Sequence, residues 1–188
     1  MNPFIAYLKQ YYHISVEAQQ ALEEEISFQQ FEKDEFLHKE GMVCRKLYFI
    51  EQGSVRGFHY NDGREVTNWF GLESNLVTSF HSFIDQQPGY EYIQTMEDSL
   101  IWSIGRETLY ALYDQFPAIE RLGRITCEQY YIRLEDRYVN AHFKTATERY
   151  QNLLQIHPQI TQRVPLGFIA SYLGISQETL SRIRSKPI

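Results

Sequence analysis

The stretch that decides the interpretation is ASYLGISQETLSRIRSK, residues 170–186, near the C-terminus of this 188-residue chain. Its apolar residues are spaced as in two short helices that cross steeply around a tight turn. Ala170 is small where the second helix must pass over the first, and Gly174 tolerates the positive φ that such a turn requires. Ser176 is a typical N-cap, and Glu178 suits the positive end of the helix dipole. The stretch therefore predicts a helix–turn–helix.

Apolar residues occupy the positions that should pack inside this motif. They are Ile169, Leu173, Ile175, Leu180 and Ile183. When Leu180 and Ile183 face inward, the opposite face of the second helix carries polar and charged side chains. A recognition helix places such a face in the major groove of DNA. A helical hairpin with a solvated outer face is the structural alternative.

The outer face of the second helix holds two groups of candidate DNA contacts. The candidates for base edges are Gln177, Glu178, Ser181 and Arg182. Arg182 can make a bidentate contact to guanine, Glu178 can accept from cytosine N4, and Gln177 can pair with adenine. The candidates for phosphates, which orient the protein without reading sequence, are Ser176, Thr179, Arg184 and Lys186.

The charge of the chain is unevenly distributed. There are 18 Lys+Arg against 24 Asp+Glu, which gives a formal net charge of −6. Residues 142–188 contain six of the basic residues and only two acidic ones, so they carry +4 and residues 1–141 carry −10. A basic segment on an acidic body indicates a nucleic-acid-binding module. Chance clustering of solvated charge is the alternative.

Residues 27–104 have the composition of β-structure. Short runs rich in Phe, Tyr, Val and Ile alternate with turn signals such as Gln52-Gly53 and Gln87-Pro88-Gly89. Asp62-Gly63 should close a tight hairpin. Strands at this spacing predict a compact antiparallel barrel or jelly roll, flanked by helical patterns over residues 4–26 and 106–115.

A long helical pattern without proline follows over residues 118–142. Its seam positions are Leu122, Ile125, Gln129, Ile132, Asp136 and Val139, spaced alternately by three and four residues. This is the spacing of a coiled coil, so we expect the helix to form a homodimer. An amphipathic helix packed on its own barrel is the alternative.

Composition and apolar runs bound the class of protein. A hydrophobic content of 43% and an aromatic content of 15% suffice for a buried core. The sequence has neither the apolar run that a membrane span needs nor the features of a signal peptide at its N-terminus. The two cysteines, Cys44 and Cys127, suit a reducing compartment. We therefore expect a cytoplasmic protein without a membrane partner.

The whole chain resembles the Crp/Fnr superfamily of bacterial transcription regulators. The resemblance rests on EFLHKEGMVCRKLYFIEQGSVRGF at residues 35–58, with glycines at expected barrel corners, on the long helix, and on IASYLGISQETLSRIRSK at residues 169–186. It implies an α+β chain with an N-terminal double-stranded β-helix (jelly-roll) barrel of the cyclic-nucleotide-binding type. A long dimerisation helix and a C-terminal winged helix–turn–helix would follow.

The resemblance also implies roles within the second helix of the motif. Ser176 and Thr179 match phosphate-contacting positions of the family, and Glu178 and Arg182 match its base readers. Gln177 stands where the family often has a further basic reader, so we expect a different operator. Since the chain ends almost directly after this helix, we expect few of the contacts that the family's wing makes, and a low affinity.

The barrel departs from the pattern of the family's cyclic-AMP binders. Those proteins carry a Gly-Glu pair for the ribose and an Arg-Ser pair for the cyclic phosphate. Thr78-Ser79 and Gly89-Tyr90 stand there in this chain, and no arginine lies between Arg64 and Arg106. We expect no response to cyclic AMP. The barrel either is a scaffold or binds an unknown small-molecule effector, for which the candidate pocket residues are Ser79, Phe80, His81, Phe83 and Tyr92.

Other chemistry finds little support in the sequence. Two distant cysteines cannot hold an iron–sulfur cluster, and the six histidines lack the spacing of a zinc site. Neither a phosphate-binding glycine loop nor a nucleophile elbow is present. We therefore expect no metal, no cofactor and no enzyme activity.

The sequence thus predicts three segments and one function. Residues 1–116 should form the sensory barrel with its flanking helices, residues 117–141 the dimerisation helix, and residues 142–188 the DNA-binding domain. The predicted function is a homodimeric transcription regulator that binds double-stranded DNA, with RNA polymerase as a candidate partner. The alternative is a ligand-binding or protein-interaction barrel that no longer binds DNA.

Overall fold

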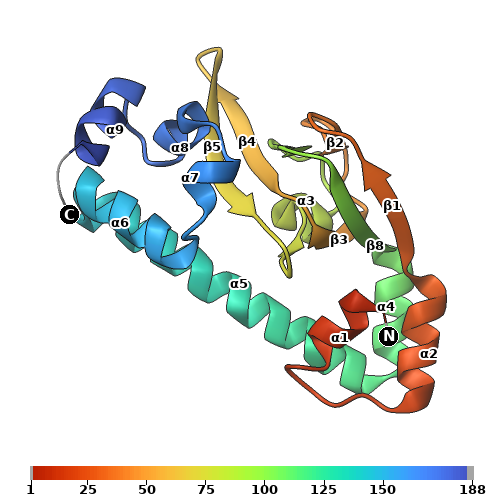
Figure 1. Cartoon of the computed structure of the whole chain (residues 1–188). Coiled ribbons are helices and arrows are strands. Elements are labelled where there is room, and N and C mark those ends of the chain that lie inside the picture. Colours follow the sequence, from red (N-terminus) through yellow and green to blue (C-terminus); the bar gives the residue numbers. More distant parts are fainter. Residues whose placement is uncertain (1, 186–188) are drawn as a thin grey trace. The chain divides into compact units, whose positions relative to one another are not determined.

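The computed structural model describes residues 2–185 and combines a β-sandwich with flanking helices (Figure 1). In chain order the elements are α1 (Pro3–Leu8), α2 (Val16–Glu25), β1 (Ser27–Phe31), β2 (Phe36–His38), β3 (Lys46–Gln52), β4 (Val55–Asn61), β5 (Arg64–Gly71), β6 (Leu76–Val77), α3 (Phe80–Asp85), β7 (Tyr92–Thr95), β8 (Ser99–Gly105), α4 (Arg106–Gln115), α5 (Pro117–Phe143), α6 (Ala146–Ile156), α7 (Ile160–Arg163), α8 (Leu166–Tyr172) and α9 (Gln177–Arg184).

The strands form two four-stranded sheets whose order does not follow the sequence. One sheet has the order β1-β8-β3-β6 and the other β2-β7-β4-β5. β8 pairs antiparallel with β1, from Ser27 opposite Ser103 to Phe31 opposite Ser99, and antiparallel with β3 on its other side. Together with the long helix and the helices after it, these sheets confirm the predicted fold class.

The β4–β5 hairpin is closed by the two residues that the sequence indicated. Asp62 has a φ of 50° and Gly63 a φ of 74°. Two positive φ values match the twist of a two-residue hairpin and favour an Asp-Gly sequence. β5 lies at one end of its sheet, so one of its edges is available for contacts outside the sheet.

The helical region expected over residues 4–26 consists of two helices. Asn2 caps α1 through its side-chain oxygen, which accepts from the N–H of Phe4 at 2.9 Å. Ser15 caps α2 by accepting from the N–H of Ala18 at 3.2 Å. Both helices present apolar residues to the same core, and Ile14 of the segment between them is buried there as well.

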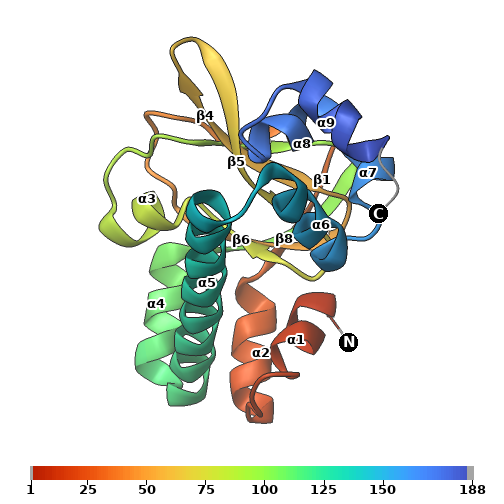
Figure 2. The ribbon, with the colours of Figure 1, turned by 90° about the vertical axis from the view of Figure 1, so that its left-hand side faces the viewer.

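The hydrophobic core of the N-terminal part lies between these helices and one face of the β1-β8-β3-β6 sheet. Alternation along β3 directs Leu47 and Phe49 to this core, and the ring of Phe4 stacks on Phe49 with centroids 5.2 Å apart. α4 and the first half of α5 run side by side and contribute Leu109 and Ile119 (Figure 2). This packing fixes where α5 begins.

The chain divides into two compact units. The first contains the chain up to Gly57 together with Phe70–Gln129, and the second contains Phe58–Trp69 together with the chain from Tyr130 onward. α5 therefore begins in the first unit and ends in the second. The tip of the β4–β5 hairpin, which the sequence placed with the barrel, has its contacts with the C-terminal helices. The three predicted domain boundaries stay a prediction.

Candidate nucleic-acid interface and effector region

The turn between α8 and α9 has the geometry that its sequence indicated. Gly174 has a φ of 64°, and the N–H of Ile175 donates to the carbonyl of Ala170 at 3.0 Å. Leu173 and Leu180 are buried, while Ile175 and Ile183 are partly buried. The apolar positions therefore hold the two helices together, and the remaining face of α9 is left to solvent.

The N-terminus of α9 is capped by Ser176, one of the residues predicted to contact DNA phosphates. Ser176 Oγ accepts from the N–H of Thr179 at 3.2 Å, and the two hydroxyl oxygens lie 3.0 Å apart. Ser176 is exposed and Thr179 is partly buried. Arg184 is exposed at the other end of the helix. Lys186, the fourth predicted phosphate contact, lies outside the described residues.

The four predicted base-reading side chains, Gln177, Glu178, Ser181 and Arg182, are exposed on α9. Arg182 Nη2 lies 3.9 Å from Glu178 Oε2, and these side chains are 75% and 86% exposed. An ion pair this long and this exposed contributes little, so both groups can turn to another partner. The amide of Gln177 instead lies over Gly167, where an added Cβ would be 2.6 Å from its Nε2.

The side chain of Ser171 joins the helix–turn–helix to the β4–β5 hairpin. Ser171 Oγ accepts from the backbone N–H of Thr67 at 2.9 Å and donates to the backbone carbonyl of Glu65 at 3.1 Å. Ser171 thus hydrogen-bonds one backbone N–H and one carbonyl at the edge of β5, as the backbone of a neighbouring strand would. Sequence reasoning missed this residue because no local pattern distinguishes it from an ordinary helix-surface serine.

The predicted seam residues of α5 differ in their surroundings. Leu122 is only 2% exposed and packs in the core of the first unit, so it lies away from solvent. Ile125 is partly buried, Gln129 is exposed, and Ile132 and Val139 are exposed apolar residues of the second half. The surface that a second copy could reach therefore lies in the later part of the predicted seam.

The five predicted pocket residues differ in their surroundings, and whether they form an effector site stays a prediction. Phe80 and Phe83 face an apolar cavity bounded by α1, α3, α4 and the start of α5. Ser79 is buried, whereas His81 is exposed with its ring 5.9 Å from that of Tyr90. Tyr92 packs edge-on against Phe36 of β2. Adjacency in sequence placed these side chains together, but α3 and β7 direct them to different surroundings.

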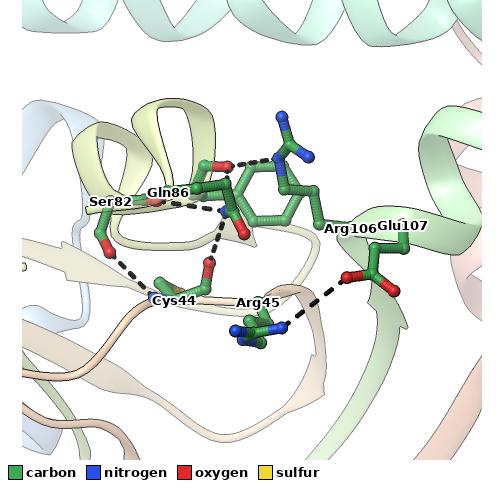
Figure 3. A network of polar contacts seen from close by, with 7 residues as sticks. Cys44, Arg45, Ser82, Gln86, Arg106 and Glu107 are labelled. Atoms are coloured by element: carbon green, nitrogen blue, oxygen red, sulfur yellow. Dashed lines mark hydrogen bonds and ion pairs between the residues drawn. The ribbon is translucent and has the colours of Figure 1, made fainter. Parts of the chain in front are cut away.

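Polar contacts hold α3 against the loop before β3 and against the start of α4 (Figure 3). Ser82 Oγ accepts from the N–H of Cys44 at 2.9 Å, and Gln86 Nε2 donates to the carbonyl of Phe83 at 2.8 Å. Arg106 Nε donates to the same carbonyl at 2.9 Å, and its guanidinium lies over the ring of Tyr110. The arginine that follows α3 in sequence thus serves the protein's own backbone.

This chain matches one family profile and resembles several solved structures. Residues 28–116 match the family described as "Cyclic nucleotide-binding domain". FixK2 from Bradyrhizobium japonicum is 20% identical with a TM-score of 0.73, and the match covers 85% of this chain and 83% of FixK2. A putative transcriptional regulator of the Crp/Fnr family from Eubacterium rectale is 16% identical with a TM-score of 0.71, covering 90% of this chain and 82% of that one. This chain has the Crp/Fnr fold.

The likeness to the catabolite activator protein of Thermus thermophilus extends over nearly the whole chain. It is 18% identical with a TM-score of 0.59, and the match covers 97% of this chain and 85% of that protein. These likenesses confirm the fold that the resemblance of the sequence motifs implied. No protein among those with curated descriptions matches this chain by sequence.

Thr78-Ser79 and Gly89-Tyr90 stand where the sequence comparison placed the Gly-Glu and Arg-Ser pairs of cyclic-AMP binders. In the structure, these residues contact other parts of the chain. Thr78 Oγ1 donates to the carbonyl of Lys46 at 2.9 Å. An added Cβ on Gly89 would lie 2.9 Å from His38 Nε2 and 3.2 Å from Ser79 Oγ. His38 is buried, and its burial lowers the pKa of the imidazole, which favours the neutral form. A neutral histidine supplies no charge to an anion here.

Sequence reasoning missed a buried arginine in the barrel, because this residue precedes the interval between Arg64 and Arg106. Arg56 on β4 is 3% exposed, and its Nε and Nη2 both donate to Gln94 Oε1, at 3.3 and 2.9 Å. The signal that could have found it is a charged residue within the apolar run that precedes the Asp-Gly turn. Two of the donors of Arg56 are therefore already used in hydrogen bonds to Gln94 and are not available to a ligand.

Among residues 2–185, no group of three or more His, Cys, Asp or Glu side chains is placed to hold a metal ion. Within the same range, no helix is both long and apolar enough to cross a membrane.

The bridge from Ser171 to β5 predicts a loss of stability on Ser171→Ala. The N–H of Thr67, a residue only 3% exposed, would lose its partner, which costs about 1–3 kcal/mol. Thermal unfolding of the full chain should show a lower Tm for Ser171→Ala. Ser181→Ala, which truncates an exposed serine on α9, is the matched control and should leave Tm nearly unchanged. Equal melting temperatures for wild type and Ser171→Ala would contradict the bridge.

Proposed function

We propose that this chain is a dimeric, DNA-binding transcription regulator of the Crp/Fnr type whose barrel does not bind cyclic AMP. The observation that carries the proposal is the exposed polar face of α9 on a packed helix–turn–helix. Side chains that can pair with base edges occupy this face, and the N-terminal cap and the last turn add phosphate contacts. The basic C-terminal segment supplies attraction to the DNA backbone.

The free state of α9 is compatible with base reading. Arg182 and Glu178 pair only loosely in water, so breaking the pair on DNA costs little. In the groove, Arg182 gains a bidentate contact with guanine and Glu178 can accept from cytosine. Because Leu180 is buried on the opposite side of the helix, this polar face is the one that remains available to DNA.

The second half of α5 supports the proposed homodimer. Its exposed apolar side chains are Tyr131, Ile132, Leu134, Tyr138, Val139 and Phe143. A single helix that leaves so much apolar surface in water gains stability when a second copy covers it. Gln129 and Asp136 are polar seam members that would set the register. Two recognition helices related by a two-fold axis would enter major grooves about 34 Å apart.

The absence of a cyclic-AMP response is proposed from the surroundings of α3. Arg106 donates to a backbone carbonyl, Arg56 is engaged with Gln94, and the segment Thr78–Tyr90 contains no arginine. A cyclic phosphate buried there would lack a charge-assisted partner from this segment. The barrel therefore serves as a scaffold or binds a different effector.

The DNA-reading face predicts the outcome of a selection from a randomised duplex pool. Wild type should enrich a roughly two-fold symmetric site, and Arg182→Ala should lose the preference because a bidentate contact supplies about 1–3 kcal/mol of discrimination. Sequencing of the selected pool measures the preference. Arg163→Ala removes the same charge from α7 and should keep the preference. A preference that survives Arg182→Ala would contradict the assignment, and no enrichment with either protein would favour a barrel that works without DNA.

The surroundings of α3 predict that cyclic AMP does not raise the Tm of the full chain. A ligand that binds only the folded state stabilises it in proportion to the logarithm of its concentration above Kd. Thermal unfolding across a cyclic-AMP titration should give a flat line. A dose-dependent rise would refute the prediction, and its loss in Arg56→Gln would identify the buried arginine as the phosphate partner.

A further inference from the structure

A cavity of about 430 Å³ lies within the second unit. β5, the second half of α5, α6 and the helix–turn–helix all contribute to its wall. Apolar side chains of α6 and α8 contribute to its lining, together with the polar side chains of Thr67, Asn68, Arg137, Asn140, Arg149, Asn152 and Ser171. Two arginines line it, and no acidic residue does so within the described part of the chain. The volume suits a small metabolite.

Arg149 is held rigidly in this wall. Its two terminal nitrogens donate to backbone carbonyls, Nη1 to Lys144 at 2.8 Å and Nη2 to Leu173 at 2.9 Å. Its Nε is buried and has no hydrogen-bond partner among residues 2–185. A buried charged donor without a partner is costly, and an anion in the cavity would supply one.

Arg137 brings a second positive charge to the same cavity. Its Nη1 donates to the carbonyl of Asn68 at 3.2 Å, which fixes the side chain between α5 and β5. Burial raises the pKa of the nearby Tyr172 phenol, while the charge of Arg137 acts in the opposite direction. A guanidinium has five N–H donors, so this contact to Asn68 uses a fraction of its capacity.

Thr67 adds an independent observation that points to a ligand. The residue is 3% exposed, and its backbone N–H is satisfied by Ser171. Its hydroxyl Oγ1, however, is buried and has no hydrogen-bond partner in the part of the chain that the structure describes. Native proteins rarely leave such a group unpaired without a ligand, ion or water.

We propose that this cavity binds a small organic anion through a carboxylate or phosphate group. Arg137 and Arg149 supply the charge, and the Thr67 hydroxyl donates a hydrogen bond to the anion. The apolar side chains of α6 and α8 cover the body of the ligand. Because the wall includes β5 and the helix–turn–helix, a bound anion ties the DNA-reading motif more firmly to the hairpin.

The test titrates the full chain, without DNA, with inorganic phosphate and separately with benzoate, against chloride of equal ionic strength. Isothermal calorimetry and NMR shifts should show one site per chain for at least one probe. A preference for phosphate would indicate a phosphate ester, and a preference for benzoate a carboxylate with an apolar body. Binding of neither probe beyond the chloride control at millimolar concentrations would overturn the proposal.

Two charge variants separate the cavity from the DNA-reading face. Arg137→Gln should weaken binding by about tenfold or more, the loss of a charge-assisted contact. Arg182→Gln removes the same charge from α9 and should change affinity less than about twofold. An equal loss in both variants would show an unspecific effect of net charge and would overturn the site.

Thr67→Val distinguishes a ligand contact from a structural role. The isosteric change removes a hydroxyl that has no partner in the described chain, so Tm should stay constant or rise. Affinity for the anion should fall because one hydrogen bond is lost. Full affinity in Thr67→Val, or a Tm well below that of the wild type, would contradict the placement of this hydroxyl in the site.

Discussion

The continuity of α5 is the constraint on which the rest of the molecule depends. Its 27 residues form one unbroken helix of about 40 Å. Its beginning is fixed in the first unit by Ile119 and Leu122 and by the close packing of Gly123 on Tyr113. Its end belongs to the second unit, where Arg137 and Asn140 bond β5 and α6. α5 is thus a continuous element that begins in the first unit and ends in the second, which contains the helix–turn–helix.

The second unit shows how a small helical motif obtains a firm attachment. Helices as short as α8 and α9 are marginal by themselves and need tertiary contacts. The edge of β5 provides these contacts, because Ser171 satisfies one N–H and one carbonyl there. The same contacts leave a cavity between the hairpin and the helices, lined by two arginines. A ligand bound in this cavity would contact the helix–turn–helix directly and would not need to act through the barrel.

The features that could be predicted from sequence are those set by neighbouring residues. Gly174 and Ser176 fix a turn and a cap through their own backbone and side chain, and Asp62-Gly63 fixes a hairpin. The missed features join residues far apart in sequence, as between Thr67 and Ser171, which are separated by 104 positions. The surroundings of the predicted effector residues could not be predicted either, because adjacency in sequence does not tell which way α3 and β7 direct their side chains.

The central claim, that a second copy covers the exposed half of α5, is tested most directly by the mass of the protein in solution. Sedimentation equilibrium of the full chain should give twice 22.4 kDa at micromolar concentration. Val139→Asp should shift the equilibrium to the single-chain mass because it places a charge in the covered seam. Glu135→Asp, a conservative change on the same helix, should keep the dimer. A wild-type mass of 22.4 kDa under these conditions would contradict the account.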